Sequence, residues 1–117
     1  MPVDFATGSE GRVHAEFQAF LAAHPEEAAD SLAIVHHVAA AGLGGLDGSQ
    51  RDRLGMARPY CHQAAGWGVF FEVAGPWNGP CTVMVLTVAD FRRAPIDRAV
   101  EEAIGRWRAA MTGGMRP

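Results

Sequence analysis

Apolar residues recur at helical spacing in two stretches of the first third of the chain. The first stretch has an apolar stripe made of Val13, Phe17, Phe20, Leu21 and His24. Pro25 stops that helix and suits the first position of a second one, whose apolar face carries Leu32, Val35, Val38, Ala39 and Leu43. Glycines from position 42 onward end the second helix. The two stripes together predict a hairpin of packed helices.

Two shorter patterns precede this hairpin. Residues 2–6 alternate between apolar and polar side chains and predict a short first strand. Thr7 and Glu10 have the spacing of a capping box, in which the hydroxyl accepts from a free helix amide and the carboxylate reaches back. This pair predicts the start of the first helix.

The second half of the chain has the pattern of strands followed by a helix. Trp67–Ala74 and Cys81–Ala89 are apolar at both alternating sets of positions, as in central strands covered on two faces, and the turn at residues 75–80 joins them antiparallel. In residues 58–63, polar residues alternate with larger ones, and the segment contains a proline, which is tolerated in edge strands. This pattern favours an edge strand. Residues 44–55 predict a loop with a helical turn.

A final amphipathic helix follows Pro95 and ends at Gly113 and Gly114. Its predicted buried stripe consists of Ile96, Val100, Ala103, Ile104, Trp107 and Met111. The elements together predict the α+β class. Residues 1–117 are expected to form a single domain in which an N-terminal helical hairpin packs on a small antiparallel sheet, with a C-terminal helix.

Composition and charge indicate where the protein is located and which partners it can bind. The chain has 117 residues, 49% of them hydrophobic, but no uninterrupted apolar run long enough to span a bilayer and no signal-peptide pattern, so we expect a soluble cytoplasmic protein. All ten basic residues are arginine, as in GC-rich bacterial genomes. Residues 1–50 hold one arginine against seven acids, and residues 51–117 hold nine against six. The two parts therefore carry net charges of −6 and +3, and the chain as a whole carries −3. An acidic protein is a poor nonspecific binder of nucleic acid, but a local arginine surface can still contact phosphate.

Two polar groups are candidates for chemistry. Arg58, Tyr60 and His62 alternate, so in a strand they project from one face, where they could bind phosphate, stack a base and move a proton. The alternative is an edge strand with a polar outer face. Arg92 and Arg93 follow the last strand and could stabilise a phosphoryl group; the alternative is a pair of solvated or acid-paired arginines.

Other chemistry-bearing residues lack a recognisable pattern. Cys61 and Cys81 have no CxxC spacing, so reduced thiols are expected, and neither metal nor cofactor is predicted. Cys61 and His62 are adjacent on a strand and point to opposite faces, which disfavours a Cys/His catalytic pair. Trp77 lies in a turn rich in proline and glycine, and its predicted exposure makes it a candidate for partner binding.

Two segments resemble the RelE/ParE superfamily of bacterial toxin-antitoxin modules. Residues 66–73 (Gly-Trp-Gly-Val-Phe-Phe-Glu-Val) are similar to that family's aromatic-Arg-apolar-apolar-Tyr strand, and residues 85–93 (Val-Leu-Thr-Val-Ala-Asp-Phe-Arg-Arg) resemble its last strand. Gly68 and Asp90 stand where the family usually has basic residues. The resemblance implies a toxin neutralised by a cognate antitoxin, either a ribosome-dependent mRNA endoribonuclease or a ParE-like inhibitor of DNA gyrase.

The first functional hypothesis is therefore a RelE/ParE-like toxin. In it, Tyr60, His62 and Arg92 would be catalytic, while Arg58, Arg92 and Arg93 would bind phosphate of mRNA on the ribosome. The alternative is a noncatalytic protein-binding or regulatory module that uses Trp77. A third possibility, a small-molecule enzyme or carrier with a pocket between sheet and helices, has no polar constellation in the sequence to support it.

Overall fold

Five strands form one sheet in the order β1-β5-β4-β3-β2. The computed structural model describes residues 3–5, 11–55 and 58–114. Strand β4 (Trp67–Ala74) pairs antiparallel with β3 (Tyr60–Ala64) on one side and with β5 (Thr82–Asp90) on the other. This arrangement confirms the predicted antiparallel strands.

The two outer strands of the sheet are short. β1 (Val3–Phe5) adds to β5 in parallel, which makes the sheet mixed, and β2 (Leu54–Gly55) adds to β3. The prediction of residues 58–63 as an edge strand was wrong, because β2 pairs with Cys61 and His62 along the outer side of β3. The two residues of β2 lie in a segment whose polar composition predicted a loop.

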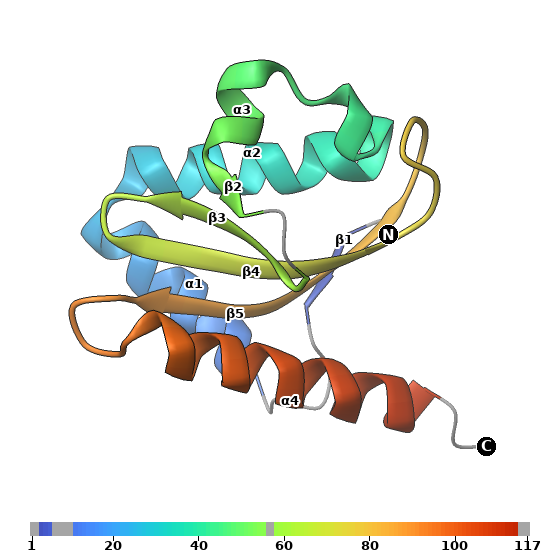
Figure 1. Cartoon of the computed structure of the whole chain (residues 1–117). Coiled ribbons are helices and arrows are strands. Elements are labelled where there is room, and N and C mark those ends of the chain that lie inside the picture. Colours follow the sequence, from blue (N-terminus) through green and yellow to red (C-terminus); the bar gives the residue numbers. More distant parts are fainter. Residues whose placement is uncertain (1–2, 6–10, 56–57, 115–117) are drawn as a thin grey trace.

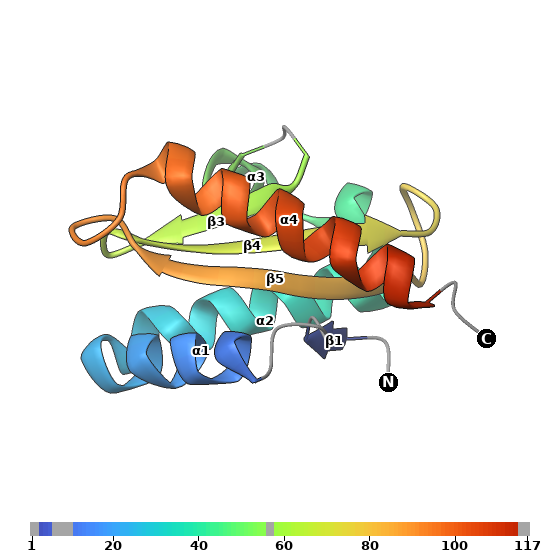
Figure 2. The same ribbon diagram turned by 90° about the horizontal axis from the view of Figure 1, so that it is seen from below.

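Helices cover both faces of the sheet. α1 (Arg12–Ala23) and α2 (Pro25–Ala41) form the predicted hairpin on one face, and α4 (Ile96–Gly114) crosses the other (Figures 1 and 2). The short η2 (Leu43–Gly45) and α3 (Gly48–Asp52) connect α2 to β2. Burial on both faces explains why β4 and β5 are apolar at every position but a few. The α+β class is confirmed.

The helix faces differ in detail from the predicted stripes. Ala28, Ser31 and Ile34 join the buried face of α2, and Ala99 joins that of α4. Ile96 and Met111, placed in the predicted stripe of α4, are 43% and 48% exposed and so lie outside its buried face. The Thr7–Glu10 capping box lies outside the described residues. No helix in the described part of the chain is long and apolar enough to cross a membrane.

Side chains bond to the backbone of β5 beyond its pairing with β1. Among the described residues, β1 pairs with Val83–Val85, and no strand is described beside the rest of that edge of β5. The Val88 amide donates to Glu16 Oε1 (3.0 Å), and Arg106 donates to the Leu86 carbonyl (2.9 Å). These contacts give hydrogen-bond partners to backbone groups of two buried residues, Leu86 and Val88.

Candidate functional site

Arg58, a predicted phosphate ligand, is bound to an acidic side chain of the sheet. Its guanidinium donates to both carboxylate oxygens of Glu72, with an Nε–Oε2 distance of 2.9 Å. The Glu72 side chain is only 5% exposed. The hydrogen bond and the negative charge of Glu72 raise the pKa of Arg58. Arg58 therefore neutralises a buried carboxylate, and moving it to a phosphate would leave that charge unpaired.

Tyr60 lies beside this pair and contacts residues on both sides of its ring. Its ring centroid is 5.8 Å from that of Phe71 on β4, and the Arg58 guanidinium carbon is 5.9 Å from the Tyr60 ring centroid. The partly buried ring thus packs between the sheet and Arg58. These contacts give Tyr60 a structural role in holding Arg58 over Glu72.

Arg92 and Arg93 are acid-paired, as the alternative interpretation of the sequence expected. Asp90 Oδ1 accepts from the Arg92 backbone amide (3.0 Å) and from Arg92 Nε (3.2 Å), and Arg93 Nε lies 3.9 Å from Asp90 Oδ2. The backbone hydrogen bond from Arg92 is the main cause of a lowered Asp90 pKa. Both guanidinium groups remain exposed, but the Asp90 carboxylate offsets part of their charge.

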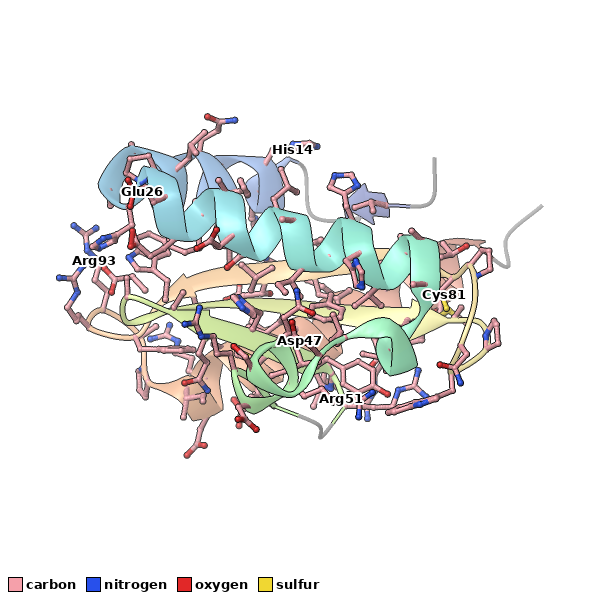
Figure 3. All side chains as sticks on the ribbon, turned by 90° about the horizontal axis from the view of Figure 1, so that it is seen from above. His14, Glu26, Asp47, Arg51, Cys81 and Arg93 are labelled. Atoms are coloured by element: carbon pink, nitrogen blue, oxygen red, sulfur yellow. The ribbon has the colours of Figure 1, made fainter. Side chains whose placement is uncertain are left out.

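The two arginine groups lie at opposite ends of the sheet. Asp90 pairs with Trp67 at the start of β4, whereas Arg58 binds Glu72 near its end. At about 3.3 Å per strand residue, these levels are roughly 16 Å apart. Figure 3 shows Arg93 at the opposite end of the molecule from Cys81, which follows the β4–β5 turn. Arg58 therefore cannot share one phosphate with Arg92 and Arg93.

Gly68 has a packing role at the position where the resembled family usually carries arginine. A Cβ atom built on Gly68 would lie 2.4 Å from the Phe91 ring and 2.9 Å from Cys61 Sγ. Any side chain there would displace Phe91, whose ring packs edge-on against Phe70. The arginine of the family motif does not fit this sheet.

Of the predicted catalytic residues, Arg92 lines one cavity together with Asp90 and Arg93, and His62 borders another. His62 is 1% exposed and lies beneath α2, where its Nδ1 is 2.8 Å from Ser31 Oγ. Burial is the main cause of its lowered pKa, and the positive charge of Arg53 adds to the effect. Ser31 is 0% exposed and so cannot act as a nucleophile on an external substrate.

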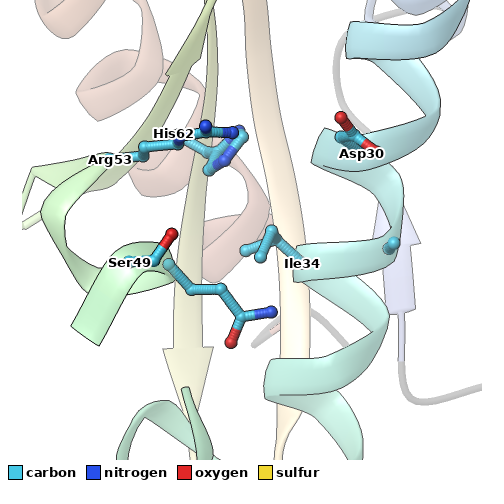
Figure 4. Close-up of a pocket in the computed structure, with 7 residues that line it drawn as sticks. Asp30, Ile34, Ser49, Arg53 and His62 are labelled. Atoms are coloured by element: carbon cyan, nitrogen blue, oxygen red, sulfur yellow. The ribbon is translucent and has the colours of Figure 1, made fainter. Parts of the chain in front are cut away.

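A cavity of about 250 Å³ opens between α2, α3 and the start of β3. Figure 4 shows Asp30 and Ile34 on α2, across from Ser49, Arg53 and His62. The lining is completed by Ala33 and Gln50. Sequence reasoning missed this group because its members come from three separate elements. One clue was available: Ser31 interrupts the apolar face of α2 between Ala28 and Val35.

The cysteines have no reactive setting. Burial raises the pKa of Cys61 to about 12, so its thiol stays protonated at neutral pH. Cys81 Sγ is 3.1 Å from the Pro76 carbonyl oxygen, to which it donates. Both thiols are buried and unpaired. Among the described residues, no group of three or more His, Cys, Asp or Glu side chains could hold a metal ion.

Trp77 is exposed, as predicted, on a turn that is fixed to the helical layer. Its side chain is 51% exposed, and the Arg51 guanidinium carbon lies 5.7 Å from its ring centroid. The Trp77 carbonyl accepts from the Gly44 amide at 2.7 Å, and the Gly79 amide donates to the Ala41 carbonyl at 2.9 Å. These bonds hold the backbone of the turn against η2 and the end of α2, so that Trp77 is displayed from a fixed position.

Comparison with protein-family models, curated proteins and solved structures gave no significant match. The RelE/ParE resemblance therefore stays a prediction. Tyr60 pairs with Phe71 and His62 with Val69, whereas Arg92 follows Asp90, which pairs with Trp67 at the start of β4, so the three residues lie at different levels of the sheet.

Proposed function

We propose that this chain is a noncatalytic protein-binding module that acts in the cytoplasm and uses Trp77 and Arg51 as its central contacts. The observation that carries the proposal is a half-exposed tryptophan on a turn whose backbone is already hydrogen-bonded to the helical layer. Tryptophan and arginine are the residue types most enriched among binding hot spots. A contact residue held in place before binding loses little conformational entropy when the partner arrives.

The positions of the other candidates also favour binding over catalysis. Arg58 is held by Glu72, Asp90 pairs with Arg92, and roughly 16 Å along β4 separates the two pairs. General acid-base catalysis needs its groups within hydrogen-bond reach of one substrate. The different levels of Tyr60, His62 and Arg92 along the sheet therefore favour the binding proposal over catalysis by these three residues.

The test begins with in-cell crosslinking to identify a partner and continues with the purified pair. We expect Trp77→Ala to weaken binding by at least tenfold, in line with a hot-spot cost of about 2 kcal/mol. Arg51→Gln should weaken it less. Arg98→Gln, an exposed arginine on α4, serves as the matched control and should leave affinity unchanged. Full affinity of the Trp77→Ala protein would refute the proposed surface.

The second candidate is the RelE/ParE-like toxin with its cognate antitoxin, including the mRNA endoribonuclease. It draws on the element order of strand, helical hairpin, antiparallel strands and C-terminal helix, an order that other α+β proteins can share. Induced expression separates the two candidates. Growth arrest with ribosome-dependent mRNA cleavage, both abolished by changing Arg92 and Arg93 together to Ala, would replace the binding proposal with the ribonuclease.

A further inference from the structure

We propose that the cavity between α2, α3 and β3 binds a small zwitterion, of the kind represented by an α-amino acid with a short aliphatic side chain. The proposal concerns a different surface from Trp77 and is independent of the proposed partner binding. It rests on three features of the cavity: a buried polar floor, opposite charges on facing walls, and an apolar side.

The floor of the cavity is the imidazole of His62. This residue is 1% exposed, and its Nδ1 is occupied by Ser31 Oγ at 2.8 Å. Within the described residues, the other ring nitrogen, Nε2, has no hydrogen-bond partner. It is not sealed off from solvent, and His62 lines the cavity. A buried ring nitrogen with one open hydrogen-bonding position favours a polar ligand group at that place.

The walls carry one charge of each sign. Asp30 projects from α2 and Arg53 from the opposite side, at the end of α3 (Figure 4). Among the residues that the structure describes, neither side chain forms an ion pair within 4.0 Å, with each other or with a third residue. A ligand carboxylate matches the planar guanidinium of Arg53, and a ligand ammonium matches Asp30.

Size and polarity set the class of zwitterion. The volume of about 250 Å³ is below the roughly 300–1,000 Å³ of sites for drug-sized molecules. Ala33 and Ile34 supply an apolar wall on α2, while Ser49 and Gln50 add polar groups from α3. Since both charged residues are also exposed to solvent, their attraction for a ligand is screened, and we expect a dissociation constant in the millimolar range.

The experiment titrates the full chain with L-alanine by calorimetry and by nitrogen-15 NMR of the histidine rings. We expect saturable binding together with a shift of the His62 Nε2 resonance. Acetate and ethylamine, which carry only one of the two charges, should each bind at least tenfold more weakly. Absence of saturable binding, an unshifted His62 resonance, or acetate binding as tightly as alanine would overturn the proposal.

Two conservative variants test whether Arg53 and Asp30 bind the charged groups of the ligand. Arg53→Gln and Asp30→Asn change exposed side chains, so both proteins should fold, and each should weaken alanine binding at least tenfold. Arg98→Gln on α4 is the matched control for loss of one arginine and should bind as the unchanged chain does. Unaltered affinity in either cavity variant would overturn the assignment of that cavity to a zwitterion.

Discussion

The surroundings of His62 are set by the helix that covers its strand as well as by the strand itself. Alternation along β3 places it on the same face as Tyr60, as predicted, but α2 covers that face at His62 and brings Ser31 within hydrogen-bonding distance. Its pKa is lowered chiefly by burial, so the neutral form is favoured in the folded protein. The residue is better described as a buried polar floor than as a proton-transfer group on an open surface.

This burial predicts a pH dependence of stability. The unfolded chain takes up a proton on His62 near pH 6.5, whereas the folded chain does so only at lower pH. The contribution of His62 to the unfolding free energy is therefore fully present above pH 6.5. It is lost as the pH falls from 6.5 toward the lower pKa of His62 in the folded protein. Urea unfolding at pH 7.5 and 5.5 should show a smaller loss of unfolding free energy in His62→Gln than in the unchanged protein.

The matched control for this measurement is His36→Gln, because His36 lies on the exposed side of α2. If His62→Gln alters the pH dependence no more than His36→Gln does, the folded protein holds His62 as readily protonated as the unfolded chain does, contrary to the burial argument.

Two glycines join the β4–β5 turn to the helical layer. Gly42 ends α2 with a φ of +77°, and a Cβ there would lie 2.3 Å from the Trp77 backbone carbonyl oxygen. A Cβ at Gly44 would instead meet side-chain atoms, Asn78 Oδ1 at 2.2 Å and the Trp77 ring at 2.5 Å. Backbone cannot move aside cheaply, but exposed side chains can rotate away.

The two glycine-to-alanine changes should therefore have different effects. Gly42→Ala combines a left-handed backbone with a backbone clash and should lower the unfolding free energy by about 2–4 kcal/mol. Gly44→Ala should cost less than about 1.5 kcal/mol but displace the Trp77 indole, visible as a shifted indole N–H resonance. Gly105→Ala on α4, where a Cβ meets no atom within 4 Å, is the control. Equal costs at Gly42 and Gly44 would contradict this distinction.

Arg106 and Glu16 connect the layers of the whole molecule. Arg106 on α4 forms two hydrogen bonds to Glu16 on α1, at 2.8 and 2.9 Å, and both residues also bond the backbone of β5. Burial lowers the pKa of Arg106, but the hydrogen bond and charge of Glu16 reverse this, so the net shift is upward. Helices on both faces are thereby tied to one strand edge.

A double-mutant cycle tests this connection. Arg106→Gln should lower the unfolding free energy by about 2–3 kcal/mol, because it leaves Glu16 and the Leu86 carbonyl short of a partner. The cycle with Glu16→Gln should give a coupling energy of about 1–3 kcal/mol. Arg108→Gln, an exposed arginine on the same helix, should change stability by less than about 0.5 kcal/mol. Additive effects of the two changes would show that the pair does not couple the layers.

Local pattern was sufficient for the main elements. The period of apolar residues predicted both helices of the hairpin, and Pro25 and Gly42 marked the ends of α2. Fully apolar alternation likewise located β4 and most of β5. These features depend on neighbours a few residues apart, so they can be read directly from the chain.

Only the tertiary structure decided what the polar residues do. The partners of Arg58 and His62 are Glu72 and Ser31, which lie 14 and 31 positions away in the chain. Whether a polar side chain is free or neutralised depends on which distant segment covers it, and no local period encodes that. The sequence by itself thus determined the helices, the central strands and the α+β class, while packing decided that Arg58 serves a buried carboxylate and that His62, Asp30 and Arg53 share one cavity.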